Sequence, residues 1–168
     1  MKILGKLRAV FAVGAIAILC STAMATTYSA LTSLDTQVAK AANTPYAITM
    51  TGESSKSFKI EGSNLTILCG GDYYFNAALQ VGSNGNATGD VYTWVRLNGK
   101  DVPDSNAVQS VPSPKFTAVL VSQGGMTLKA GDVLEFMYAG TSPGLGIIAW
   151  TPANMPAVPS IIFSIFQI

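Results

Sequence analysis

The sequence of 168 residues contains no histidine. Histidine is the commonest general base and the commonest metal ligand, so its absence argues against the usual acid–base and zinc chemistries. The sequence also lacks the G-x-S-x-G motif that would place a nucleophilic serine. The isolated pairs Gly70-Gly71 and Gly124-Gly125 are typical of turns and not of phosphate-binding loops. We therefore expect a protein that is not an enzyme and that has no resident cofactor, apart from the calcium hypothesis given below.

Charge is scarce as well. Charged residues make up 11% of the chain, whereas an average soluble domain has roughly 25%. Ten basic and nine acidic residues give a net charge of +1, and no basic stripe is present. Nucleic acid is therefore excluded as an expected partner. A chain so poor in charge must stay soluble through Ser, Thr, Asn and Gly, or bury part of its surface in an oligomer.

Only two cysteines are present, Cys20 and Cys69. The first lies in an apolar N-terminal run, and the second lies in the region of predicted strands. We do not expect the two cysteines to pair. We expect Cys69 to be a small buried apolar residue.

Residues 1–25 combine a positive start, an apolar stretch and the sequence Ala23-Met24-Ala25. This pattern predicts a secretory signal peptide with an A-x-A cleavage site. The alternative is an uncleaved membrane anchor, although the uncharged stretch 9–25 is shorter than the ~20 residues that span a bilayer. Both hypotheses predict an apolar helix that contacts a membrane, in a protein that is exported or membrane-associated.

The rest of the chain has the pattern of an all-β protein. Residues 26–43 are predicted to be a linker or a lead-in strand, and residues 44–168 to be one domain of short strands. The stretch Tyr73–Val81 alternates apolar and polar residues, which indicates a strand with one buried face. Asn98-Gly99 predicts a two-residue hairpin. Turn signals every 8–12 residues favour a sandwich or barrel.

The stretch from Ile161 to Ile168 is apolar at both odd and even positions. Such a run indicates a strand buried on both sides. One face would fill the sandwich, and the other would meet a neighbouring subunit.

Several short motifs occur in order along residues 35–168. They are Asp35-Thr-Gln37, Ala41–Ile48, the "G-x-Y-x-F" strand Gly71–Asn76, the "V-x-x-W-x-R-x-N-G-x-x-V-P" hairpin Val91–Pro103, the "L-x-A-G-D" turn Leu128–Phe136, and Pro156–Ile162. This series resembles the tumour necrosis factor-like (TNF-like) jelly-roll family, which includes complement-type globular heads. Within that family it resembles the structural proteins of phages and large viruses.

The resemblance implies a jelly-roll sandwich that assembles as a compact homotrimer. In such trimers the inner sheet, which includes the first and last strands, packs on the threefold axis. The trimer interface is accordingly predicted at four residues of the last strand: Ile161, Phe163, Ile165 and Ile168.

Two further groups of residues are candidate binding sites. Tyr92, Trp94 and Arg96 share one face of a predicted strand, so Tyr92 and Arg96 are candidate ligand-facing residues. The alternative packs Trp94 between the sheets and pairs Arg96 with Glu135 or Asp132. Asp101 and Asp104 are candidate calcium ligands, although Ca²⁺ needs 6–8 oxygen atoms and a solvated turn explains the pair as well.

Two functional hypotheses follow. The first is a structural or assembly protein, a trimer displayed on a virion as a minor capsid, decoration or fibre-type protein, with other virion proteins as partners. The second is an exported bacterial surface or secreted trimer that binds a ligand or mediates adhesion at a cell surface. The corresponding locations are the virion surface and the extracellular space or cell surface.

Overall fold

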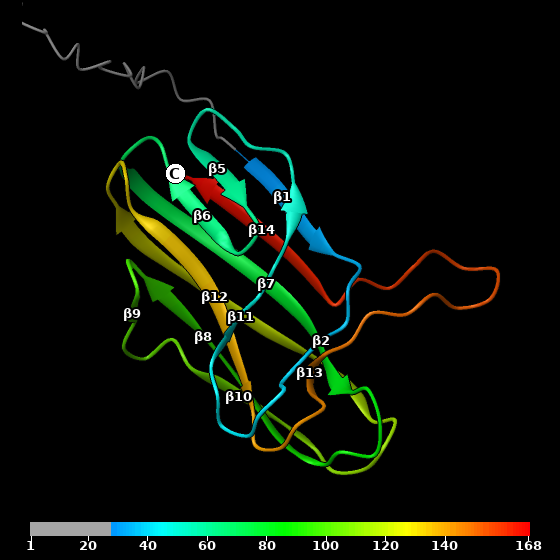
Figure 1. The fold of residues 1–168 in the computed structure, drawn as a ribbon. Helices are drawn as coiled ribbons and strands as arrows, with labels where there is room; N and C mark the ends of the chain where they lie inside the picture. Colours follow the sequence, from blue (N-terminus) through cyan, green and yellow to red (C-terminus); the bar gives the residue numbers. More distant parts are fainter. Residues whose placement is uncertain (1–27) are drawn as a thin grey trace, which may run out of the picture.

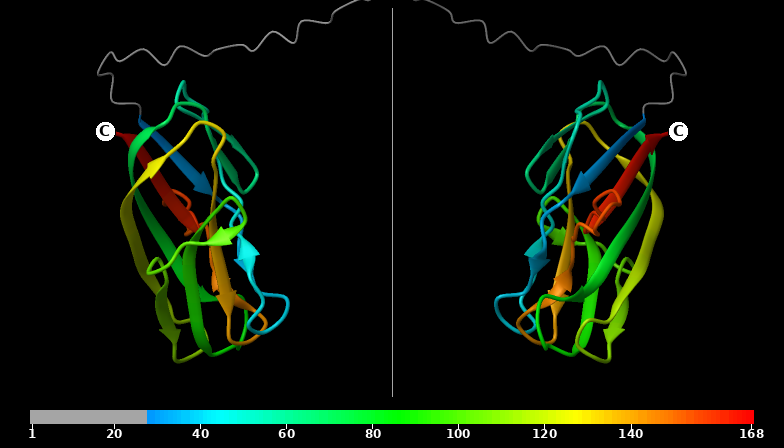
Figure 2. Two further views of the ribbon diagram at one scale, coloured as in Figure 1. Left: turned by 90° about the vertical axis from the view of Figure 1, so that its left-hand side faces the viewer. Right: turned by 90° about the vertical axis from the view of Figure 1, so that its right-hand side faces the viewer.

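The computed structural model describes residues 28–168, which form two antiparallel sheets packed face to face (Figure 1). Seen from the side, the sheets are the two layers of a sandwich (Figure 2). The apolar helix and the membrane contact predicted for residues 1–25 lie outside the described residues. Among residues 28–168 there is no helix that is long and apolar enough to cross a membrane.

Sheet A has the strand order β2-β13-β7-β14-β1-β4, with β11 on the other edge of β7. Its strands are β1 (Tyr28–Ser33), β2 (Gln37–Val38), β4 (Thr51–Gly52), β7 (Gly71–Ser83), β11 (Thr117–Leu128), β13 (Leu145–Ile147) and β14 (Ile161–Gln167). The segment 26–43, expected to be a linker or lead-in strand, supplies β1 and β2. The folded domain therefore begins earlier than the predicted boundary at residue 44.

Sheet B has the strand order β10-β8-β12-β6-β5, with β3 beside β12 and β9 beside β8. Its strands are β3 (Tyr46–Ala47), β5 (Phe58–Glu61), β6 (Asn64–Ile67), β8 (Gly89–Leu97), β9 (Lys100–Asp101), β10 (Ala107–Val111) and β12 (Val133–Gly140). The chain passes repeatedly from one sheet to the other, which is the arrangement of a jelly roll. The predicted all-β sandwich is confirmed.

The core lies between the sheets, and β7 is its longest contributor. The alternating residues from Tyr73 to Val81 are at most 4% exposed, so the inward face predicted for this strand is confirmed. Phe75 of sheet A lies edge-on to Phe136 of sheet B, with 5.4 Å between ring centroids, and Phe163 lies 5.0 Å from Phe136. These ring pairs join the sheets, and each contributes about 0.5–1.5 kcal/mol beyond its buried area.

The hairpin predicted at Asn98-Gly99 joins β8 to β9, and both turn residues have positive φ, 50° and 75°. Such a two-residue turn matches the twist of the strands. The Asn98 amide donates to Asp132 Oδ1 at 2.8 Å, and Asn98 Oδ1 accepts from the Val133 N–H at 2.9 Å. Asp132 also accepts from the Lys129 N–H, and these bonds, led by that of Asn98, lower the pKa of its carboxyl. Two motifs of the resemblance thus hold each other in place.

Two local expectations are wrong. Gly124-Gly125 is not a turn, because both residues lie inside β11 and pair with Phe75 and Tyr74. A Cβ on Gly124 would lie 3.1 Å from Phe75 Cζ, so glycine lets β11 pass close over that ring. Cys69 is buried as expected, at 7% exposure, but it is disulfide-bonded.

Candidate assembly and ligand-binding surfaces

The outward side of sheet A is one candidate surface. Its four longest strands β11, β7, β14 and β1 are paired side by side, so their outward side chains form one continuous layer, named here the sheet A face. It comprises Val119, Val121, Gln123, Gly125, Tyr74, Asn76, Ala78, Gln80, Ile162, Ser164, Phe166, Ala30 and Thr32. None of these residues is charged, and Asp72, the one charged outward side chain of the described part of these four strands, lies beyond them at one end of β7.

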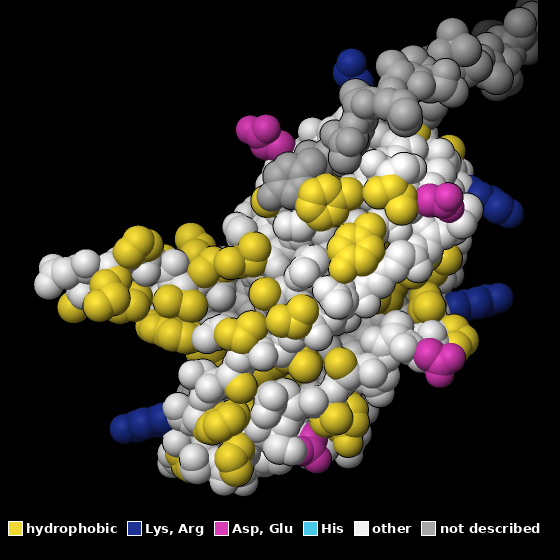
Figure 3. Space-filling view, turned by 180° about the vertical axis from the view of Figure 1, so that it is seen from behind, with side chains coloured by type: hydrophobic (Ala, Val, Ile, Leu, Met, Phe, Trp, Pro, Cys, Tyr) yellow, Lys and Arg dark blue, Asp and Glu magenta, His cyan; other side chains and the backbone are white. Residues whose placement is uncertain are grey.

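Strand register arranges the sheet A face in rows. One row is apolar in β11, β7 and β14, with Val121 opposite Ala78 and Ala78 opposite Ile162. The next row is polar and consists of Gln123, Asn76 and Ser164. Figure 3 views this side of the molecule, where hydrophobic side chains are spread over the face among uncharged polar ones and the few charged side chains lie mostly towards the margin. A surface of this kind favours burial against another protein surface.

The predicted trimer interface lies on the wrong side of β14 for three of its four residues. Ile161, Phe163 and Ile165 point into the sandwich and are 0% exposed, so they cannot contact a neighbouring subunit. Their outward counterparts on the strand include Ile162, which is 47% exposed. Ile168 is 79% exposed and remains available for an interface.

The outward side of sheet B carries the predicted patch of Tyr92, Trp94 and Arg96. These residues alternate along β8 with Val91, Thr93 and Val95, which are 0% exposed and face the core. The patch therefore points away from the core, and packing of Trp94 between the sheets is wrong. The candidate ligand-facing residues Tyr92 and Arg96 lie on the solvent side, as a ligand would require.

Asp101 anchors this patch. Its Oδ1 accepts a hydrogen bond from the Trp94 indole N–H at 2.7 Å and another from Arg96 Nε at 2.8 Å. Arg96 therefore pairs with Asp101 and not with Glu135 or Asp132. The bonds from Arg96 and Trp94 lower the pKa of the Asp101 carboxyl below its usual value of 3.8. The indole ring is consequently held in one orientation with its polar edge already bonded.

A shallow hollow of about 380 Å³ lies over this patch, named here the aromatic hollow. It is lined by Asn43, Pro45, Tyr92, Trp94, Asp101, Val102, Asn106 and Ala139. The lining combines two aromatic rings, two side-chain amides and one carboxylate. Asn43 comes from the loop between β2 and β3, so segments far apart in the sequence build the two sides of the hollow. The sequence pattern singled out Tyr92 but neither asparagine, although Asn43 lies within the motif Ala41–Ile48; Asn106 lies outside the motifs.

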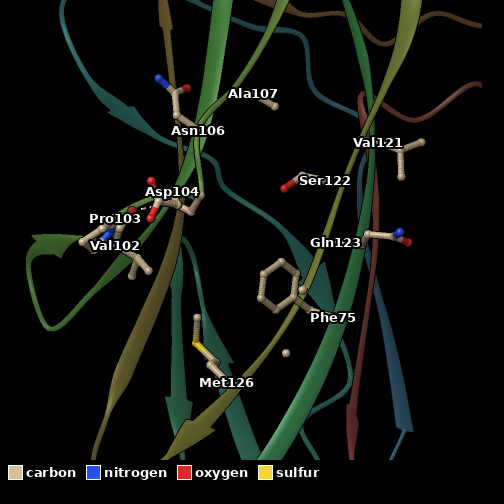
Figure 4. A pocket seen from close by; sticks show the side chains of 13 residues that line it. Phe75, Val102, Pro103, Asp104, Asn106, Ala107, Val121, Ser122, Gln123 and Met126 are labelled. Carbon is tan, nitrogen blue, oxygen red and sulfur yellow. Dashed lines mark hydrogen bonds between the residues drawn. The ribbon is translucent and has the colours of Figure 1, made fainter.

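A second hollow, also of about 380 Å³, lies where the segment from Val102 to Ala107 faces β11 (Figure 4). In Figure 4 Phe75 and Met126 lie at the base, while Val121 and Gln123 point away from it. Asp104 lines this second hollow, whereas Asp101 lines the aromatic hollow.

The two candidate calcium ligands, Asp101 and Asp104, are exposed carboxylates that line different hollows. The carboxylate of Asp101 is already paired with Arg96. No group of three or more acidic or cysteine side chains suited to a metal ion occurs in residues 28–168. Melting of the protein with and without a chelator tests the hypothesis, and an unchanged melting temperature would reject it.

The connection between β13 and β14 projects from the edge of the sandwich (Figure 1). Trp150 and Val158 form an isolated antiparallel bridge at its base. Trp150 is 38% exposed and Met155 is 67% exposed, and residues 148–160 contain no charge. This projection places the second tryptophan of the chain well apart from Trp94 in sequence and in the fold.

Comparison with solved structures identifies the architecture. The crystal structure of murine APRIL at pH 5.0 matches with a TM-score of 0.59, over 85% of this chain and 99% of that one, at 11% identity. The murine APRIL structures at pH 8.5 and pH 8.0 each match with a TM-score of 0.54, at 11% and 12% identity, over 84% of this chain and 100% of theirs. The fold is a TNF-like jelly roll.

At these identities the likeness concerns the TNF-like fold alone. It confirms the sandwich expected from the motif series and gives no support to the phage and large-virus branch within the family. No protein-family model and no curated protein matches the sequence.

Proposed function

We propose that the protein is a non-catalytic assembly module that forms a homotrimer through the sheet A face. The observation that carries this proposal is the absence of charge from that face. Tyr74, Val119, Val121 and Ile162 are large hydrophobic residues of this face with 36–57% of their surface exposed. The only charged outward side chain on β11, β7, β14 and the described part of β1 is Asp72, at one end of β7, where it accepts a hydrogen bond from Thr127 Oγ1 at 2.6 Å.

Trimer formation would bury these side chains. It would remove few charged groups from water, so the cost of desolvating charge would be small. Burial of apolar area contributes about 25 cal/mol per Å², and a threefold ring closes without leaving an unpaired copy of the interface. The polar row of Gln123, Asn76 and Ser164 would add directional hydrogen bonds between subunits. The TNF-like fold supports this arrangement, because sheet A holds the first and last strands.

Light scattering of the purified full-length chain tests the proposal. A mass three times that of the subunit, independent of dilution into the micromolar range, is the expected result. A stable monomer at micromolar concentration would overturn the proposal, and a dimer would overturn the threefold arrangement.

The trimer would be displayed on an outer surface, and two settings remain as hypotheses. Display on a virion is supported by the motif series that resembles phage and large-virus proteins. Display at a bacterial cell surface, or secretion, is supported by the signal-like residues 1–25. Co-purification with virus particles favours the first setting, and co-purification with a cell envelope favours the second.

A further inference from the structure

We propose that the aromatic hollow on sheet B binds a neutral carbohydrate, with one pyranose ring of a glycan lying against Trp94 and Tyr92. This inference is independent of the trimer, because the hollow lies on the opposite sheet from the sheet A face. It concerns a site and a ligand class, and it rests on the aromatic, polar and electrostatic properties of the lining.

The aromatic part of the argument starts from the ring faces. The faces of aromatic rings carry partial negative charge, whereas the C–H groups on one side of a pyranose ring carry partial positive charge. Stacking a sugar on a ring is therefore favourable, and it buries apolar surface on both partners. The orientation of the Trp94 ring is fixed, because its N–H donates to Asp101 Oδ1 at 2.7 Å. Tyr92 lies two residues before it on the same side of β8, and Ala139 adds an apolar wall.

The polar part of the argument concerns the rim. Asn43 and Asn106 are exposed, and neither side-chain amide makes a hydrogen bond to any described residue. Each amide offers two donors and an acceptor, which matches the paired hydroxyl groups of a sugar. The backbone of Asn43 is fixed by a left-handed φ of 53° and by donation of its N–H to the Gly140 carbonyl at 2.8 Å. One rim amide therefore sits on a well-held loop beside the rings.

Charge decides which sugars fit. The carboxylate of Asp101 is balanced by Arg96, so the hollow has no net charge to attract a cation or an anion. Phosphorylated or acidic ligands would need a free cationic group, which the lining does not contain. A neutral polyhydroxylated ring satisfies the amides without requiring a counter-charge. The hollow is also shallow, which suits an exposed residue of a longer glycan.

Tryptophan fluorescence offers a direct test, because the chain has only Trp94 and Trp150. In the full-length Trp150→Phe variant the emission comes from Trp94 alone. The probes are the methyl glycosides of glucose, galactose, mannose, fucose, N-acetylglucosamine and N-acetylgalactosamine, each titrated into the millimolar range. At least one should change the emission in a saturable way and give saturation-transfer NMR signals from the protein to its ring protons.

Variants locate the response. Trp94→Ala should weaken binding of the responding glycoside about tenfold or more, as measured by NMR. Trp94→Phe keeps a ring face and should lose less, and Asn106→Ala should weaken binding through loss of the rim amide. The matched control is Trp150→Ala, which removes the other indole and should leave the affinity unchanged. Thermal melting checks that each variant is folded.

Three results would overturn the inference. One is the absence of a saturable response to all six glycosides. Another is equal affinity in folded Trp94→Ala and Trp94→Phe variants. The third is a site that takes a polypeptide, shown by a peptide ligand that loses affinity in Trp94→Ala while none of the glycosides competes with it. Tighter binding of N-acetylneuraminic acid than of every neutral sugar would contradict the neutral character of the ligand.

Discussion

The two outward surfaces of the sandwich differ more than its two inward surfaces do. Both sheets bury the same kinds of aliphatic and aromatic side chains between them. Outside, the sheet A face is free of charge, whereas sheet B carries the Lys59–Glu61 and Arg96–Asp101 ion pairs. Both sheets must fill the same core, which explains why their inward side chains are alike. We attribute the difference between the outward side chains to what each outward surface contacts. The sheet A face is suited to another copy of the subunit, and sheet B to water and a small ligand.

The largest expected effect is on assembly. Ile162→Asp would place one unpaired carboxylate per subunit in the sheet A face, and an uncompensated buried charge costs several kcal/mol. We expect a monomer by light scattering. The matched control is Val108→Asp on sheet B, where Val108 is 53% exposed beside Tyr92. Equal dissociation of both variants, or of neither, would remove the distinction between the two surfaces.

The adjacent residue of β14 should affect the subunit itself. Phe163 is 0% exposed and packs on the rings of Phe75 and Phe136. Phe163→Ala should lower the free energy of unfolding by about 3–5 kcal/mol. Denaturant unfolding is best measured in the monomeric Ile162→Asp background, because association would otherwise add to stability. A loss below 1 kcal/mol would contradict the inward position of Phe163.

The inward side of sheet B contains an unsatisfied polar group. Thr93 is 0% exposed, and its Oγ1 has no hydrogen-bond partner among the described residues. Valine has nearly the same shape without the hydroxyl, so Thr93→Val should raise the free energy of unfolding by about 1 kcal/mol. Thr66→Val, on the outward side of β6, is the control and should change stability little. A destabilised Thr93→Val variant would indicate a partner for this hydroxyl.

The smallest expected effect is a pH response of Trp94. The pKa of Asp101 is below 3.8 in the folded chain, because Arg96 and Trp94 donate to its carboxylate. Since the folded pKa lies below the unfolded one, the pairing stabilises the fold above about pH 4 and is lost as pH falls through the folded value. In the Trp150→Phe background the emission should stay constant from neutral pH to pH 4 and change below it.

The Asp101→Asn substitution should abolish this transition, whereas Asp104→Asn should not alter it. A transition that persists in Asp101→Asn would mean that another group controls the indole.

Prediction from the sequence succeeded where one periodicity or one turn dominated. The alternation along Tyr73–Val81 identified the buried face of β7, because the polar residues Asn76 and Gln80 at alternate positions show which face is outward. Asn98-Gly99 gave the hairpin, because few residues tolerate two consecutive positive φ values. The same hairpin also fixes a side-chain pair. A two-residue turn sets Arg96 opposite Asp101, which is the pair that the structure contains.

Prediction failed where the local pattern did not show which face of a strand is buried, or where it conflicted with strand pairing in the folded protein. In β14 both faces are apolar, so nothing in the sequence separates Phe163, which is in the core, from Ile162, which is outside. A glycine pair normally indicates a turn, but pairing along the whole of β7 keeps Gly124-Gly125 in a strand. The rim of the aromatic hollow needs a loop of residues 39–45 to lie against β8, and no local rule gives that contact.

The position of β14 has a consequence for how the subunit folds. This strand lies between β7 and β1, with Phe166 opposite Tyr28, so β1 has no neighbour on that side until residues 161–167 are in place. Closing such a long loop costs entropy before any pairing repays it, and folds rich in distant contacts reach the native state slowly. Until then β1 and β7 would present open strand edges, which readily pair with other chains. Early loss of soluble protein during refolding, suppressed by dilution, would indicate that these strand edges are exposed before β14 is in place.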